Sequence, residues 1–227
     1  IAHDLRAPFQ GFLGLTEELA SAVNSLSQEE YALYGKSMHD SAANIYSLLE
    51  NLLEWSKIQR GLVEFKPVKT DLAASVYSIL NLFEARSVQK KITLNVAIEP
   101  GVSPFVDGNV LNTVLRNLIS NALKFTPREG KIEISAEGHG KTVSISVKDN
   151  GVGMSPEFVE KLFKISEKVS REGTEGESSS GLGLVLCSEL VKKSGGTISP
   201  ALNEWKDNSP FGGMTFTVTL PASNIEE

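Results

Sequence analysis

The sequence predicts an α+β protein in which a pair of N-terminal helices precedes a sheet that is covered by helices on one face. Apolar residues recur at steps of three and four over about the first sixty positions, which is typical of packed helices. Beyond them, short stretches alternate apolar and polar residues, which is typical of half-buried strands. The hydrophobic content of 41% is enough for a packed core. We therefore expect a helical hairpin at 1–62, a linker at 63–70, an α/β sandwich domain at 71–222 and a tail at 223–227.

The first helix is expected from Ile1 to about Val23, and the second begins at a capping box. In Ser27-Gln28-Glu29-Glu30 the serine oxygen can accept a hydrogen bond from the amide three residues on, while Glu30 reaches back to the serine N–H. The second helix then continues to about Arg60. Its apolar and small residues form a heptad seam made of Tyr31, Tyr34, Met38, Ser41, Ile45, Leu48, Leu52 and Trp55.

A second apolar line on this helix predicts how the chain assembles. Ala42, Leu49 and Leu53 widen the apolar stripe beyond what one partner helix can cover. Two hairpins paired as a four-helix bundle would bury this stripe, so we expect a homodimer. The alternative is a hairpin that packs against the other domain of its own chain.

The elements of the α/β domain follow from helix caps and from alternation. Pro67 argues against a helix in the linker, and Asp71 can cap the helix that comes after it. The stretch 92–98 alternates apolar and polar residues like a strand. Asp107 can then cap a helix at Gly108–Phe125.

The second half of the domain should complete the sheet. The stretches 131–136 and 142–148 predict a β-hairpin, and Ser155-Pro156 predicts the start of a helix that reaches Phe163. Residues 166–180 are rich in Ser, Gly, Glu and Lys, and we expect them to form a mobile lid. The remaining elements are a helix at 182–193 and strands near 197–199 and 215–220, which give a mainly antiparallel sheet.

Composition excludes several functions. A net charge of -6 argues against a nucleic-acid partner that is held by a basic surface. The single cysteine excludes an intrachain disulfide, which favours the cytoplasm. Because no run of 18 apolar residues occurs, we expect a membrane to be contacted only through a segment that this chain does not contain. The chain would then be cytoplasmic, or the cytoplasmic part of a membrane-anchored protein.

The first candidate for chemistry is His3 in the opening helix. Its imidazole could act as a nucleophile, because Asp4 could orient the ring through one nitrogen and accept its proton. Pro8 removes a backbone donor and would loosen the helix about one turn further on. The alternative is an ordinary solvated histidine, which is the commoner case for a lone histidine.

The second candidate group lies on the helix at Gly108–Phe125. Asn117 and Asn121 are four residues apart, so their amides share a face, and Lys124 is close by. Amide oxygens are hard neutral ligands that suit a Mg²⁺ ion which bridges phosphates. The alternative is a pair of amides that simply face solvent.

Two glycine-containing stretches complete the candidates. Asp149-Asn150-Gly151-Val152-Gly153-Met154 follows a strand, and a carboxylate at a strand end can accept a hydrogen bond from an exocyclic amine. Taken alone, this stretch is also a good turn. Gly181-Leu182-Gly183-Leu184 opens a helix, where unsatisfied backbone amides suit phosphate.

Four motifs in this order resemble those of sensor histidine kinases. They are HDLRAPF around His3, NLISNALKF at Asn117–Phe125, DNGVGM at Asp149–Met154 and SSGLGL at Ser179–Leu184. The short histidine box is only moderately specific, but the four motifs in this order, over nearly the whole chain, are highly specific. The resemblance implies a dimerisation and histidine-phosphotransfer hairpin followed by an ATP-binding sandwich domain. That domain is shared with type II topoisomerases, mismatch-repair ATPases and a heat-shock chaperone family.

The resemblance also implies a role for each matching residue. Asn121 would be the Mg²⁺ ligand, Asn117 and Lys124 would lie near the phosphates of ATP, and Phe125 would cover the adenine. Asp149 would contact the adenine amino group, with Gly151 and Gly153 as the pocket floor. The second glycine box, Gly181, Leu182, Gly183 and Leu184, would bind phosphate.

Three further positions are less firmly matched. Lys168 and Arg171 in the lid could meet the γ-phosphate, although a solvated charged loop is equally consistent with the sequence. The family's G-T-x-F pattern has Met214 at the threonine position, so an adenine contact is either lost or taken over by Thr215.

The implied activity is ATP-dependent autophosphorylation of His3, with Asp4 aiding proton removal, followed by phosphoryl transfer to an aspartate of a response regulator. Ala7 stands where many such kinases have Thr or Asn, so we expect weak phosphatase activity toward the regulator. The alternative is a nucleotide-responsive dimeric scaffold with little turnover. A topoisomerase-like or chaperone-like ATPase is disfavoured because a histidine hairpin precedes the site. Phosphorylation within one subunit or between two remains open, since it depends on the twist of the bundle at the turn between the two helices.

Overall fold

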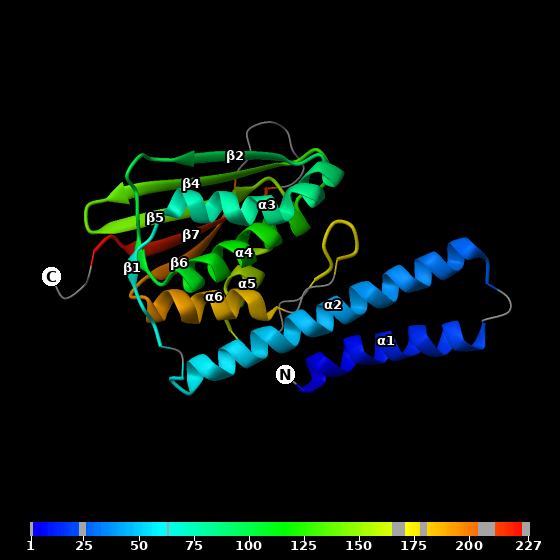
Figure 1. The fold of residues 1–227 in the computed structure, drawn as a ribbon. Coiled ribbons are helices and arrows are strands. Elements are labelled where there is room, and N and C mark those ends of the chain that lie inside the picture. Colours follow the sequence, from blue (N-terminus) through cyan, green and yellow to red (C-terminus); the bar gives the residue numbers. More distant parts are fainter. Residues whose placement is uncertain are drawn as a thin grey trace.

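The computed structural model describes residues 2–22, 26–62, 64–164, 171–177, 181–203 and 212–223, with the side chains of 2–8, 44 and 47 left aside. Two long helices, α1 (Ala2–Ser21) and α2 (Gln28–Gln59), form an antiparallel hairpin that projects from the rest of the chain (Figure 1). The capping box is confirmed. The Glu30 N–H donates to Ser27 Oγ at 3.2 Å, and the Ser27 N–H donates to Glu30 Oε2 at 2.7 Å.

The two apolar lines of α2 have different surroundings. Ile45 and Leu48 on the heptad seam are buried, with Leu48 only 3% exposed. On the second line, Leu49 is 39% and Leu53 is 61% exposed in the single chain. In the single chain the seam is therefore buried only in part, while Leu49 and Leu53 on the second line stay open.

The rest of the chain is a five-stranded sheet with three long helices on one face (Figure 1). The strand order is β2 (Thr93–Ile98), β4 (Lys131–His139), β5 (Thr142–Asp149), β7 (Met214–Pro221) and β6 (Thr197–Leu202). Only the β2–β4 pair is parallel, so the mainly antiparallel sheet is confirmed. The helices are α3 (Leu72–Lys90), α4 (Gly108–Phe125) and α6 (Leu182–Lys193).

Helix α4 lies at the centre of the core, between the sheet and the helices α3 and α6. Asp107 caps it as predicted, accepting from the Asn109 N–H at 2.8 Å. Its buried face packs against the inward residues of the sheet and against α3 and α6. The buried apolar residues of α4 are Val110, Leu111, Val114, Leu115, Leu118, Ile119, Ala122 and Leu123.

Two short elements differ from the sequence-based expectation. Part of the linker is β1 (Val68–Lys69), which pairs with β3 (Phe105–Val106) and so joins the linker to the domain. Helix α5 covers only Pro156–Val159 instead of reaching Phe163. Ser155 caps α5 and proline starts it as expected, but the turns that follow do not continue the helix.

The C-terminal end of α2 packs on α6. Ile58 is fully buried, and its carbonyl accepts from the Lys193 ammonium. The Gln59 amide also donates to Glu189 at 3.3 Å. Packing of the hairpin on its own chain, which was the alternative to a dimer, therefore occurs at the end of α2. In the described part of the chain, no helix is both long and apolar enough to cross a membrane.

Candidate functional site

A pocket opens where the ends of several elements meet on the helical side of the sheet. It lies between the last turns of α4, the end of β5, the start of β7 and the first turn of α6. The residues that line it are Asn121, Ala122, Phe125, Asp149, Gly153, Met154, Arg171, Leu184, Met214 and Phe216. The lining is thus mostly apolar, with one amide, one carboxylate and one guanidinium, which suits a flat ligand with a few polar edges.

Asp149 is the buried carboxylate of this pocket, with 4% of its surface exposed. Its Oδ1 accepts hydrogen bonds from the Gly151 N–H at 2.8 Å and the Met214 N–H at 3.2 Å. Burial raises the pKa of Asp149 to about 6, against the opposing effect of these two donors and of Arg171. Since both amides bond to Oδ1, the second oxygen is the one available to a ligand.

The loop after Asp149 is fitted against the end of α4. The Val152 N–H donates to the Phe125 carbonyl at 3.1 Å. A Cβ on Gly151 would lie 2.3 Å from that same carbonyl oxygen, so only glycine fits there. This approach keeps Asp149 and Phe125 at one end of the pocket.

The amide-bearing face of α4 meets the first turn of α6. The Asn117 amide donates to the Thr113 carbonyl at 2.9 Å. Its Oδ1 is so close to Gly183 that a Cβ on that glycine would lie 2.5 Å away. Gly181, the residue that precedes α6, has a φ of 69°, a left-handed conformation that favours glycine. The structure therefore brings two of the sequence motifs together, with Asn121 lining the pocket beside them.

Lys124 and Arg171 are the described basic residues of the predicted site. The pKa of Lys124 is lowered to about 8, mainly by burial and also by Arg86, while Glu177 opposes the change. The Arg171 guanidinium carbon lies 4.8 Å from the centroid of the Phe125 ring. Arg171 thus stands at the Phe125 end of the pocket, whereas the sequence suggested a phosphate contact.

Three other predicted site residues lie partly or wholly outside the description. His3 and Asp4 belong to the first turn of α1, but their side chains are not among those described. Lys168 falls in the range 165–170, outside the described residues.

Thr215 is not brought to the pocket, contrary to the expectation that it could replace the missing threonine. Successive residues of β7 point to opposite faces of the sheet, and Met214 takes the pocket face. The Thr215 hydroxyl instead bonds Asn203 Oδ1 at 2.5 Å. The Met214 N–H supplies the bond to Asp149, which is a backbone role that no side-chain motif could reveal.

Part of the segment that we expect to form a mobile lid makes defined contacts with the domain. Residues 171–177, here called the lid loop, are described and are held by hydrogen bonds. The Thr174 N–H donates to the Lys124 carbonyl at 3.0 Å, and the Gly173 N–H donates to the Glu177 carbonyl at 2.7 Å. The composition of the segment indicated polarity, but not that its polar groups would find partners on α3 and α4.

The family can be assigned once this geometry is known. Residues 106–224 match the model of the histidine kinase-, DNA gyrase B- and HSP90-like ATPases, which is more than half of the chain. The chain therefore belongs to this ATPase family, and the prediction from the four motifs is confirmed.

Two relatives that match over nearly the whole chain are named as histidine kinases. Histidine protein kinase DivJ of Caulobacter vibrioides is 30% identical over 97% of this chain and 36% of its own length. BaeS of Escherichia coli, a signal transduction histidine-protein kinase, is 27% identical over 97% of this chain and 45% of its own length. The chain thus spans less than half the length of these two relatives.

Solved structures share the fold of both parts. Histidine kinase AdeS of Acinetobacter baumannii superimposes with a TM-score of 0.77 at 23% identity, covering 99% of this chain and 100% of its own. Histidine kinase ThkA, solved in complex with response regulator protein TrrA, gives a TM-score of 0.75 at 22% identity, covering 98% of this chain and 60% of its own. The combination of helical hairpin and ATPase domain is thereby confirmed.

Proposed function

We propose that this chain is the kinase core of a two-component sensor, which binds ATP in the pocket and phosphorylates its own His3. The observation that carries the proposal is the buried Asp149, held by two backbone amides in a mostly apolar pocket that Phe125 also lines. Such a carboxylate can accept the exocyclic amine of adenine while the ring stacks on the aromatic side chain. The family model and the sensor kinases that match the whole chain support this reading.

The phosphates of ATP would lie toward the first turn of α6, away from Asp149. The backbone amides at that helix start, after Gly181, provide donors there, and Asn117, whose side chain lies beside Gly183, would be near the phosphates. Lys124 would add positive charge, because with a pKa of about 8 its amine is protonated in most molecules at pH 7.

Asn121 is the residue that would hold Mg²⁺. Its amide lines the pocket, and a neutral hard oxygen suits this ion. The described residues contain no group of three or more His, Cys, Asp or Glu that could hold a metal, so the remaining ligands would be phosphate oxygens and water. Bound there, Mg²⁺ would neutralise negative charge on the phosphates.

The proposed chemistry is an in-line phosphoryl transfer. A nitrogen of His3 forms a bond to the γ-phosphorus while the bond from that phosphorus to the ADP oxygen breaks, and the imidazole proton passes to Asp4. The phosphohistidine then donates the phosphoryl group to an aspartate carboxylate of a response regulator and regenerates the imidazole. ThkA, a fold relative, is known in complex with a response regulator, which supports such a partner.

Two further parts of the proposal concern assembly and reversal. The exposed line on α2 supports a homodimer through the hairpin, because two copies would bury it. Ala7 carries no hydrogen-bonding group that could position water, so we propose that regulator dephosphorylation by this route is weak.

The test is incubation with Mg²⁺ and γ-labelled ATP beside His3→Gln and Asn121→Ala. We expect acid-labile, base-stable label on the parent chain and none on either variant. Equal labelling of His3→Gln would overturn the assignment of the phosphorylated residue. Bound ATP without label, measured by a separate titration, would instead favour the nucleotide-responsive scaffold.

A further inference from the structure

The space between Asp149 and Phe125, here called the adenine subsite, is already occupied in the structure. Arg171 lines the pocket there, and its guanidinium carbon lies 4.8 Å from the centroid of the Phe125 ring. The cavity that the lining side chains leave measures about 20 Å³, against about 150 Å³ for a protein cavity that takes up benzene. Because adenine is larger than benzene, a lining side chain must leave before the base can stack on Phe125.

Arg171 is the lining residue that can leave. The other lining residues belong to α4, to α6, to the sheet or to the tight loop that follows Asp149. Arg171 comes instead from the lid loop and is only half-buried. Moving a long cationic side chain into water restores its hydration, whereas moving an apolar side chain of α4 or β7 would open the core.

Arg171 also has the properties that we assign to the base. A guanidinium is planar and delocalised, so it can stack on an aromatic ring as adenine does. Burial raises the pKa of Asp149 and lowers that of Arg171, and the attraction between the two opposite charges opposes both shifts. Arg171 and adenine therefore compete for the same ring and the same carboxylate.

The lid loop keeps Arg171 near the ring, because its backbone lies directly on the end of α4. The Thr174 N–H donates to the Lys124 carbonyl at 3.0 Å. A Cβ on Gly173 would lie 2.5 Å from Cγ of Lys124, so the backbone contact is close. Since Arg171 is only three residues from the bonded amide, its side chain stays within reach of Phe125.

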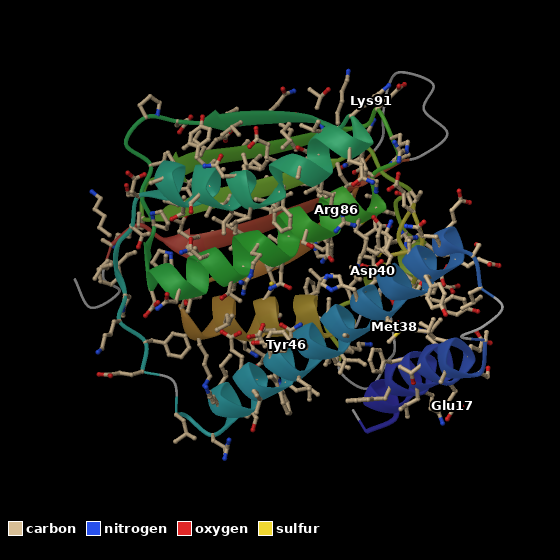
Figure 2. All side chains as sticks on the ribbon, turned by 45° about the vertical axis from the view of Figure 1, so that its right-hand side comes forward. Glu17, Met38, Asp40, Tyr46, Arg86 and Lys91 are labelled. Carbon is tan, nitrogen blue, oxygen red and sulfur yellow. The ribbon has the colours of Figure 1, made fainter. Side chains whose placement is uncertain are left out.

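Polar side chains fix the rest of the lid loop to α3 and α4. Lys90, the last residue of α3, is only 1% exposed. Its ammonium donates to the Leu123 carbonyl at 2.9 Å, to Thr174 Oγ1 at 2.8 Å and to Glu177 Oε1 at 3.3 Å. Glu177 also accepts from Arg86, which Figure 2 shows near the C-terminal end of α3. A buried ammonium needs such partners, so these contacts hold the lid loop in place.

We propose that Arg171 autoinhibits the chain by blocking the adenine subsite, and that Lys90, Thr174 and Glu177 anchor the lid loop so that the block persists until nucleotide displaces it. The inference rests on the proposed ATP site and adds a competition within the chain. Only molecules in which Arg171 has left the subsite can bind nucleotide, so the observed affinity falls in proportion to their fraction. A more loosely anchored lid loop should therefore bind nucleotide more tightly.

The test is a double-mutant cycle in the full chain with Mg²⁺-ADP as the probe. Glu177→Gln keeps the side-chain size and removes the charge that pairs with Lys90, outside the pocket lining. We expect it to raise ADP affinity about two- to fivefold, and Arg171→Ala to raise it about three- to tenfold. The double variant should bind no more tightly than Arg171→Ala alone, because without the blocking side chain the anchor has no effect on binding. Glu64→Gln, which alters an exposed ion pair with Lys66, is the matched control.

Binding rates distinguish release of a block from a new contact with the nucleotide. Because Arg171 must leave before ADP enters, both variants should raise the association rate of ADP and leave its dissociation rate unchanged. A gain that appears only as slower dissociation would overturn the inference. Equal or weaker ADP binding by the two folded variants would overturn it as well.

Thermal unfolding without nucleotide shows whether each variant is folded. Thr174→Val, which keeps the side-chain shape and loses the hydroxyl that accepts from Lys90, replaces Glu177→Gln if that variant does not fold. If neither the parent chain nor Arg171→Ala binds ADP, the proposed function fails. If both bind ADP equally, only the autoinhibitory role of Arg171 fails.

Discussion

Asp149 shows how a single side chain can be costly for stability and useful for binding. Its carboxylate is buried, and two backbone amides together with the nearby Arg171 stabilise its charge. The sequence predicted Asp149 as a site residue from its place at a strand end and from the resemblance of the DNGVGM motif. It could not predict the pKa, because the burial comes from residues of α4 and β7 that lie far away in the chain.

We expect Asp149→Asn to be more stable than the parent at pH 7.5 and unable to bind adenine. The folded-state pKa of about 6 lies above the ordinary 3.8, so the stabilising contribution of the protonated form is complete below pH 3.8 and is lost as the pH rises through 6. That difference corresponds to about 3 kcal/mol at neutral pH. Urea unfolding should show most of this gain at pH 7.5 and little at pH 4.

The same variant should bind ADP at least about a hundredfold more weakly, because an amide NH₂ would face the adenine amine, donor against donor. In the parent chain, ADP affinity should fall as the pH drops below 6, since the protonated carboxyl no longer presents two acceptors. An unchanged affinity in Asp149→Asn would contradict the assigned contact.

Arg171 leads to a second prediction at this scale. Its guanidinium lies over the Phe125 ring, in the place where we expect the adenine. Removing it with Arg171→Ala should therefore raise the affinity for adenosine by about three- to tenfold, since the ring no longer has to displace a stacked cation. Arg128→Ala is the matched control, because that arginine pairs with Glu175 at 2.8 Å outside the pocket lining. Weaker adenosine binding in Arg171→Ala would argue that the arginine assists the base.

At the scale of elements, helices with strong end signals were predicted to the residue. Helix α4 runs from Gly108 to Phe125 and α6 from Leu182 to Lys193, as expected from Asp107 and from the flanking glycines. The sequence predicted a lid at 166–180 but not the contacts of residues 171–177, because the carbonyls of α4 that hold them carry no sequence signature. Local signals therefore located the elements, whereas contacts between distant segments decided how residues 171–177 are held.

Two glycines at element junctions should respond differently to alanine. Gly183→Ala would push its Cβ against the movable Asn117 side chain, so we expect little loss of stability and at least a tenfold loss of Mg²⁺-ADP affinity. Gly151→Ala would meet the fixed carbonyl of Phe125 and should cost about 2–4 kcal/mol of stability. Denaturant unfolding and titration of both variants measure the contrast. Gly108→Ala, with open space around its Cβ, is the control.

At the scale of the whole molecule, the homodimer that we propose would bury the exposed line of α2. Leu53 is 61% exposed on that line, so Leu53→Glu should convert the expected homodimer to a monomer in light scattering. Leu33 is 64% exposed but lies off the line, and Leu33→Glu should remain dimeric. A parent chain that is already monomeric at micromolar concentration would contradict the proposed assembly.

Because Ile58 packs on α6, helix α2 fixes both the distance and the angle between its heptad seam and the ATPase domain. The helix is continuous over 32 residues, so its heptad seam and its contact with the ATPase domain keep a constant angular phase. Removing one residue between them would turn the domain by about 100° around the helix axis. Removing seven would restore the phase to within about 20° while shortening the spacing by about 10 Å. The direction in which the pocket faces is therefore encoded by a residue count, independently of any side chain in the pocket.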